Sequence, residues 1–221
     1  EPSDVVFAGT PTRAWVSVSQ ENAIKLYDPS NLATAPQVLA VPARQPRSLA
    51  VSADGGTVYA AILDGNDGTT VLTQAEAGDS LPAPQPPMSA SLPAAPKTGL
   101  IVQFTNGHWR DVSGKLWDSK VPYSVPRVEV VRYSTANPAA PASFGGLATS
   151  MFAAAVNPTT GMCAAIGTEA RTEVRFEPNL RGHTTEGRVA LIPTSGSATS
   201  VPLNPHINYA VPFGPQSERD S

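Results

Sequence analysis

The fold is indicated most clearly by the stretch Ala50-Val51-Ser52-Ala53-Asp54-Gly55-Gly56-Thr57-Val58-Tyr59-Ala60-Ala61-Ile62. Two apolar runs flank the pair Asp54-Gly55, and glycine accepts the positive φ that tight hairpin turns require. The stretch Ala155-Val156-Asn157-Pro158-Thr159-Thr160-Gly161-Met162-Cys163-Ala164-Ala165-Ile166 repeats this design, with a polar turn that ends in glycine and a second run that ends Ala-Ala-Ile. An internal repeat of strand hairpins is typical of β-propellers.

Other runs alternate apolar and polar residues, or end at turn signals, as half-buried strands do. These runs are residues 14–19, 23–28, 47–52, 57–62, 97–104, 108–111, 127–133, 172–176 and 188–192. A looser echo joins residues 15–28 to residues 58–72 at a spacing of about 43 residues, close to the length of a propeller blade. We therefore predict an all-β fold: a β-propeller of antiparallel four-stranded blades, forming an incomplete or a closed ring, with a long Pro-rich loop.

The composition excludes several other classes of protein. Charged residues make up 15% of the chain and 23 of the 221 residues are proline, which argues against long helices. The formal net charge of −3 offers no basic face for nucleic acid or anionic lipid. No apolar run approaches the roughly 20 residues of a membrane span. The single cysteine, Cys163, excludes an internal disulfide, a paired-cysteine zinc site and a covalent c-type haem, and we expect a buried, inert thiol.

Residues 76–96 are rich in Pro, Ala and Ser and contain hardly any apolar anchor. Such a segment cannot bury enough surface to offset the entropy of ordering it, so an exposed excursion is expected. The predicted organisation is a first set of blades at 1–75, the excursion at 76–96 and further blades at 97–221.

Two groups of residues are candidate metal ligands. The oxygens of Asp64, Asn66 and Asp67 could hold calcium, although clusters of this kind also form ordinary hairpin turns. His183 and His206 could ligate a metal, although a lone histidine beside a turn more often makes a hydrogen bond. No nucleophile elbow or phosphate-cradling glycine pattern is present, so the chain carries no catalytic signature and its being an enzyme is left open.

Charges of alternating sign run through Glu169, Arg171, Glu173, Arg175 and Glu177, and Arg181 opens the turn that follows. In an extended strand these side chains share one face, where neighbours of opposite sign can pair. We expect a structural ion-pair ladder that locks blades together, and the alternative is a docking surface for a partner.

Several segments resemble known families. Residues 45–55 resemble the strand-and-turn segment of bacterial YVTN-type β-propellers. Residues 97–104, 109–111, 155–158, 168–177, 181–183 and 203–209 resemble large exported propeller proteins that carry a di-haem cytochrome c peroxidase-like module. Gly167 stands where that family has Asn, and Pro202, Pro205 and Asn208 stand where it has His, Lys and Asp, so the roles of those residues do not transfer.

The resemblance implies a bacterial protein of the periplasm or the extracellular space whose signal peptide has been removed before Glu1. It implies a propeller subunit for binding or scaffolding in a larger redox-related assembly, with no cofactor covalently bound to this chain. The expected partners are other protein chains or the remainder of its own propeller, because a part-ring leaves sheet edges to be paired. One alternative is a fragment of a c-type haem oxidoreductase whose haem module lies outside this chain. Another is a structural subunit that assembles edge to edge.

Overall fold

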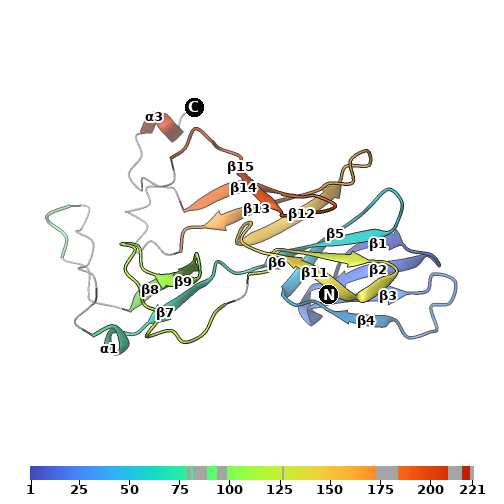
Figure 1. The fold of residues 1–221 in the computed structure, drawn as a ribbon, viewed down its shortest axis with the longest axis horizontal. Coiled ribbons are helices and arrows are strands. Elements are labelled where there is room, and N and C mark those ends of the chain that lie inside the picture. Colours follow the sequence, from blue (N-terminus) through green and yellow to red (C-terminus); the bar gives the residue numbers. More distant parts are fainter. Residues whose placement is uncertain are drawn as a thin grey trace. The chain divides into compact units, whose positions relative to one another are not determined.

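The computed structural model describes residues 1–78, 81, 89–93, 99–125, 127–172, 184–208 and 216–219. Their strands form three four-stranded sheets and one three-stranded sheet, and the strand pairs in these sheets are antiparallel (Figure 1). The prediction of an all-β fold is therefore confirmed, and three of the sheets have the four antiparallel strands of a propeller blade.

The chain forms two compact units. The first comprises residues 1–66, 127–169 and 187–203, and the second comprises residues 67–126, 170–186 and 204–221 within the part that is described. Each unit is thus built from separate stretches of sequence. The predicted division at residues 75 and 96 remains a prediction.

Sheet 1 of the first unit is a meander of four consecutive strands. They are β1 (Pro2–Ala8), β2 (Arg13–Val18), β3 (Ala23–Tyr27) and β4 (Gln37–Ala40), in that order. The short helix η1 (Ser19–Glu21) makes the turn between β2 and β3, and Asn22 ends it in the left-handed conformation.

Sheet 2 is assembled from two hairpins that are far apart in the sequence. Its strands are β5 (Arg44–Val51), β6 (Thr57–Asp64), β10 (Val130–Ser134) and β11 (Asn137–Phe144), with β6 paired to β10. The turn between β5 and β6 has Gly55 at φ +69°, and the Asp54 carboxylate accepts the Gly56 N–H at 2.9 Å. The predicted Asp-Gly hairpin is confirmed.

Sheet 3 repeats the meander of sheet 1. Its strands are β12 (Ser150–Val156), β13 (Cys163–Ala170), β14 (Thr185–Ile192) and β15 (Thr199–Pro202). The two stretches identified as a sequence repeat form the hairpins β5–β6 and β12–β13, which occupy the same place in sheets 2 and 3. With segment 67–126 set aside, their offset is about one blade length, roughly 45 residues.

The looser echo of residues 15–28 over residues 58–72 is wrong in its second half. Residues 58–72 run through β6 and into β7, and these strands belong to different sheets. The strand of sheet 2 that corresponds to β3 is β10 instead, because the segment 67–126 separates the two hairpins of that sheet. The edge strand β11 was not predicted, since its two prolines and small residues resemble a loop.

Apolar clusters join the three sheets of the first unit in sequence order. Sheet 1 packs on one face of sheet 2 through a cluster that includes Trp15, Ile24, Val58, Ile62 and Tyr133. Sheet 3 packs on the other face of sheet 2 through a cluster that includes Tyr59, Val130, Met151, Cys163 and Ile192. Cys163 is fully buried, as expected, and burial raises the pKa of its thiol to about 12.

Among its described residues, the second unit has a three-stranded sheet and two short helices. The strands are β7 (Thr69–Leu72), β8 (Leu100–Thr105) and β9 (His108–Arg110), and the helices are α1 (Gln74–Ala77) and α3 (Gln216–Arg219). Its core includes Trp109 and Trp117, whose indole Nε1 donates to the buried Asp111 at 2.9 Å. Ala77 is also in this core, so the predicted exposed excursion is packed at its beginning. Much of residues 79–98 lies outside the described residues.

Candidate functional site

The first strands of the three blades lie next to one another in the first unit. β1 contacts β5, and β5 contacts β12. Each of these strands also has a β-bulge at the same place, where one residue has no partner in the register: Ser3 in β1, Arg47 in β5 and Phe152 in β12. A bulge redirects its extra side chain out of the regular alternation of the strand.

The residue after each bulge is in a position to bond the next blade. The Asp4 carboxylate accepts the N–H of Leu49 at 2.7 Å, which joins sheet 1 to sheet 2. The Ser48 hydroxyl accepts the N–H of Ala154 at 3.4 Å, which joins sheet 2 to sheet 3. The corresponding residue of sheet 3 is Ala153, whose methyl group cannot accept such a bond. This hydrogen bond between neighbouring sheets, which we call the lock between sheets, is therefore formed from sheet 1 to sheet 2 and from sheet 2 to sheet 3. Sheet 3 has no side-chain acceptor at the equivalent position.

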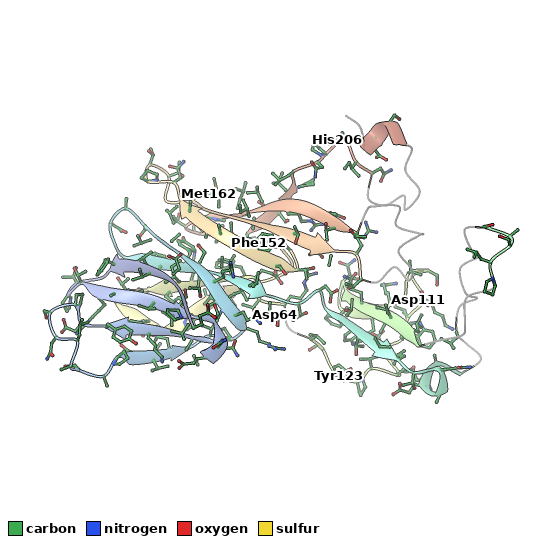
Figure 2. The ribbon with its side chains drawn as sticks, turned by 180° about the vertical axis from the view of Figure 1, so that it is seen from behind. Asp64, Asp111, Tyr123, Phe152, Met162 and His206 are labelled. Atoms are coloured by element: carbon green, nitrogen blue, oxygen red, sulfur yellow. The ribbon has the colours of Figure 1, made fainter. Side chains whose placement is uncertain are left out.

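A groove of about 670 Å³ lies at these strands, and all three bulge residues line it. Gln45 and Leu63 contribute to the same wall, and Gln45 has a φ of +58°, which side chains other than glycine seldom adopt. Phe152, labelled in Figure 2 on β12, is 44% exposed. We call this groove the axial groove, because it lies along the adjacent first strands β1, β5 and β12. It combines a guanidinium group, amides and an aromatic ring.

The outward face of sheet 1 is largely apolar, and several of its side chains are exposed to solvent. We call it end face 1, and the strand registers bring together its apolar residues Val5, Phe7, Ala14, Val16, Tyr27 and Val38. Lys25, which pairs with Glu21, lies between Val16 and Val38 on the same face. Val5 is 51% exposed and Phe7 is 60% exposed. Contiguous apolar patches are unusual on monomeric soluble proteins and mark interaction sites.

The outward face of sheet 3 has the same character. We call it end face 3, and its apolar residues, which alternate with those of the buried cluster, are Ala153, Ala155, Ala164, Ile166, Val189, Leu191 and Val201. Thr199 lies opposite Leu191 on the same face. Ile166 is 48% exposed and Val201 is 44% exposed.

The two end faces correspond to opposite sides of an interface that the chain already makes. Aligned by their bulges, Val5 and Phe7 of sheet 1 correspond to Leu49 and Val51 of sheet 2, which pack against sheet 1. The same alignment matches Ala155 of end face 3 to Ala50 of sheet 2. Ala50 pairs with Tyr59, which packs against sheet 3. End face 3 therefore corresponds to the face with which sheet 2 contacts the sheet after it in the sequence. End face 1 corresponds to the face with which sheet 2 contacts the sheet before it.

A buried network of charges connects sheets 2 and 3. The Arg127 guanidinium donates to both oxygens of Glu169, at 2.9 and 3.1 Å, and lies 3.4 Å from the Glu129 carboxylate. The Leu147 N–H donates to Glu129 at 2.8 Å, and the Glu129 side chain has no exposed surface. Burial raises the pKa of Glu129 to about 7, against the lowering effects of the Leu147 N–H and of Arg127.

Two of the alternating charges expected to form a ladder, Glu169 and Arg171, have partners outside the run. Glu169 pairs with Arg127, and Arg171 pairs with Glu186 at 3.3 Å, because β13 ends at Ala170 before the run is complete. The ladder between neighbours in the run stays a prediction, because Glu173 lies outside the described residues. Arg175, Glu177 and Arg181 lie outside the described residues, so their roles remain predictions.

The predicted calcium ligands have protein partners. Asp64 forms an ion pair with Arg44 at 3.4 Å. Asp67 accepts the N–H of Thr69 at 3.1 Å and its hydroxyl at 2.7 Å, as in an Asx turn. Asn66 adopts a φ of +60°. These contacts are those of the ordinary turn that was the alternative to a calcium site, and calcium binding stays a prediction.

Of the two candidate histidine ligands, His206 is exposed in a turn after β15 (Figure 2) and His183 lies outside the described residues. Within the described part of the chain, no three His, Cys, Asp or Glu residues are grouped so as to hold a metal ion. In the same part, no helix is long and apolar enough to cross a membrane.

Sequence reasoning did not identify the bulge residues of the axial groove, although a usable signal was present. The repeat aligns Ala50 with Ala155, and the same offset applied to Arg47 reaches Phe152. Extending the alignment upstream of the hairpins would have shown these residues to be equivalent. Ser3 had no such signal, because β1 was not predicted.

Comparisons with known proteins add little to this picture. Neither a family model nor a curated protein sequence matches the chain. Among solved structures, the hydrazine synthase of Kuenenia stuttgartiensis is similar over 92% of this chain and 54% of its own, with 12% identical residues and a TM-score of 0.37. The chain thus spans about half the length of that structure, and a similarity this weak supports no conclusion about function.

Proposed function

We propose that this chain is a β-propeller subunit for scaffolding and binding, and that it packs end faces 1 and 3 against further blades. The exposed apolar side chains of these faces carry the proposal, because the equivalent residues of sheet 2 are buried between sheets. A monomer with both faces open would leave surface in water that the same chain covers at its two internal interfaces.

The chemistry of the faces specifies the partner. A flat array of Val, Ala, Ile and Phe side chains on a twisted sheet matches another four-stranded antiparallel sheet, packed about 10 Å away. Closed propellers have four to eight blades, and the first unit supplies three. The partner is accordingly another protein chain or the remainder of the same propeller.

The setting is also part of the proposal: a bacterial periplasmic or extracellular protein within a larger redox-related assembly. It is supported by the sequence resemblance of residues 97–104 and 168–177 to exported propeller proteins with a haem module. Because a c-type haem needs two cysteines, any such haem belongs to another part of the assembly.

Self-association provides the test, since every copy carries both kinds of face. End face 3 of one copy can receive end face 1 of another, and two copies would supply six blades. Light scattering after size exclusion should give a wild-type chain that is dimeric or larger at about 100 µM, the range of a moderate affinity. Phe7→Asp and Ile166→Asp should each give monomers, because every contact between copies uses end face 1 of one copy and end face 3 of the other.

Leu32→Asp is the matched control, since Leu32 is an exposed apolar residue in the loop between β3 and β4 and lies on neither face. It should associate as the wild type does. The proposal would be contradicted if the wild-type chain stayed monomeric and if the Phe7→Asp and Ile166→Asp variants were no more soluble than the wild type.

A further inference from the structure

We infer that the axial groove is a binding site for an organic carboxylate with an attached apolar group, in which Arg47 binds the carboxylate and Phe152 contacts the apolar part. The site lies on the first strands of the blades and is separate from end faces 1 and 3. It therefore goes beyond the proposed function and can be tested independently of it.

The repeat brings the two key side chains to the same groove. Arg47 and Phe152 are the extra residues of equivalent bulges in adjacent strands, and both line the groove. Bulges are frequent next to binding sites because they redirect a side chain. The positions are equivalent but the residues differ, a cation on β5 and an aromatic ring on β12, so the groove has one charged side and one apolar side.

The Arg47 guanidinium is available for a ligand. In the described part of the chain it forms no ion pair, whereas Arg44 on the same strand pairs with Asp64. Asp4 also lines the groove, but its two oxygens accept the N–H groups of Val5, at 2.8 Å, and Leu49, at 2.7 Å. A free guanidinium binds a carboxylate with two parallel N–H···O bonds, the strong and specific geometry for this pair.

Glu1 lies at the groove as well and forms no ion pair with Arg47 among the described residues. The nearby hydroxyls bond to protein groups: Ser3 and Ser19 contact each other at 2.5 Å, and Ser19 donates to the Pro46 carbonyl at 2.7 Å. Among the described residues that line the groove, Arg47 is the one with a cationic side chain.

The apolar side and the size of the groove limit the rest of the ligand. Phe152 and the half-buried Leu63 provide apolar surface within a volume of about 670 Å³. This volume lies within the range of small-ligand sites, about 300–1,000 Å³. A small aromatic or branched acid fits this description, and so does an acidic side chain next to an apolar one in a partner peptide.

Phenylacetate and its neutral isostere phenylacetamide are suitable probes, titrated against the chain and followed by NMR chemical shifts. Phenylacetate should bind at least about tenfold more tightly than phenylacetamide, the difference supplied by Arg47. Arg47→Met should remove this preference, and Arg47→Lys should restore only part of it. Arg44→Met is the control and should leave the preference unchanged.

Phe152→Ala should weaken both probes to a similar extent, because it removes the apolar contact that they share. The dipeptide acetyl-Asp-Phe-amide is a further probe for the source of the carboxylate: tighter binding than phenylacetate indicates a peptide segment, and weaker binding a free acid. Equal binding of phenylacetate and phenylacetamide, no binding of either, or a preference that survives Arg47→Met would each overturn the inference. The same titration on the Phe7→Asp chain should give the same result, which separates it from the docking of blades.

Discussion

Replacing Arg127 with Met should destabilise the first unit strongly, and the loss should depend on pH. The substitution keeps an unbranched apolar side chain but removes the guanidinium, which leaves Glu129 and Glu169 without their shared cation. The Ala148 carbonyl also loses its donor, the guanidinium at 3.1 Å. Breaking a buried ion pair by removing one partner costs about 3–5 kcal/mol of unfolding free energy. We expect a loss in this range near pH 8.

The pH dependence follows from Glu129. Its folded-state pKa of about 7 is above the ordinary carboxyl value of 4.5, so the folded chain binds this proton more tightly than the unfolded chain. The contribution of this group to stability is greatest below about pH 4.5 and is lost as the pH rises to about 7, by roughly 3 kcal/mol. Near pH 5 Glu129 is protonated, so Arg127→Met should cost clearly less there than near pH 8.

Urea unfolding followed by circular dichroism, near pH 5 and near pH 8, measures both effects. Glu129→Gln should flatten the pH dependence of the wild type, because the amide still accepts the Leu147 N–H and does not titrate. Arg13→Met is the matched control: the pair of Arg13 with Asp28 is partly exposed, and such pairs contribute about 0–1 kcal/mol. An equal loss for Arg127→Met at the two pH values, or one no larger than that of Arg13→Met, would refute the reasoning.

Two further substitutions test local hydrogen bonds. Asp4→Ala should lower the unfolding free energy by about 1–3 kcal/mol, because the N–H groups of Leu49 and Val5 lose their acceptor, and Asp4→Asn should cost less; urea unfolding with no measurable change for Asp4→Ala would be evidence against the lock between sheets. Thr73→Ala should weaken α1 by about 1 kcal/mol, since it removes the capping box with Glu76, and hydrogen exchange in α1 should accelerate; the control Glu76→Gln can keep the reciprocal bond, and exchange that is unchanged in Thr73→Ala would contradict the role of the cap.

Local chemistry accounts for the part of the fold that could be predicted. The turn at Asp54-Gly55 was predicted from its glycine, and Gly55 has the positive φ that such a turn requires. The strands β1 and β15 were missed, because their short runs contain Pro, Ser or Asp and take their partners from neighbouring strands. Glu169 was singled out as a structural candidate from the alternating run, but its partner Arg127 is 42 residues away and no pattern in the run indicated it.

The all-β class, the individual hairpins and the repeat between 50–62 and 155–166 follow from the sequence alone, since each depends on turn residues and alternation within about a dozen positions. The pairing of β6 with β10 across segment 67–126, the alignment of the bulges and the axial groove depend on tertiary packing. The physical reason is the range of the interactions. A hairpin closes a short loop through bonds made by its own residues. Pairing between distant strands must offset the entropy of closing a long loop, and it does so through burial summed over whole sheets, which no local pattern encodes.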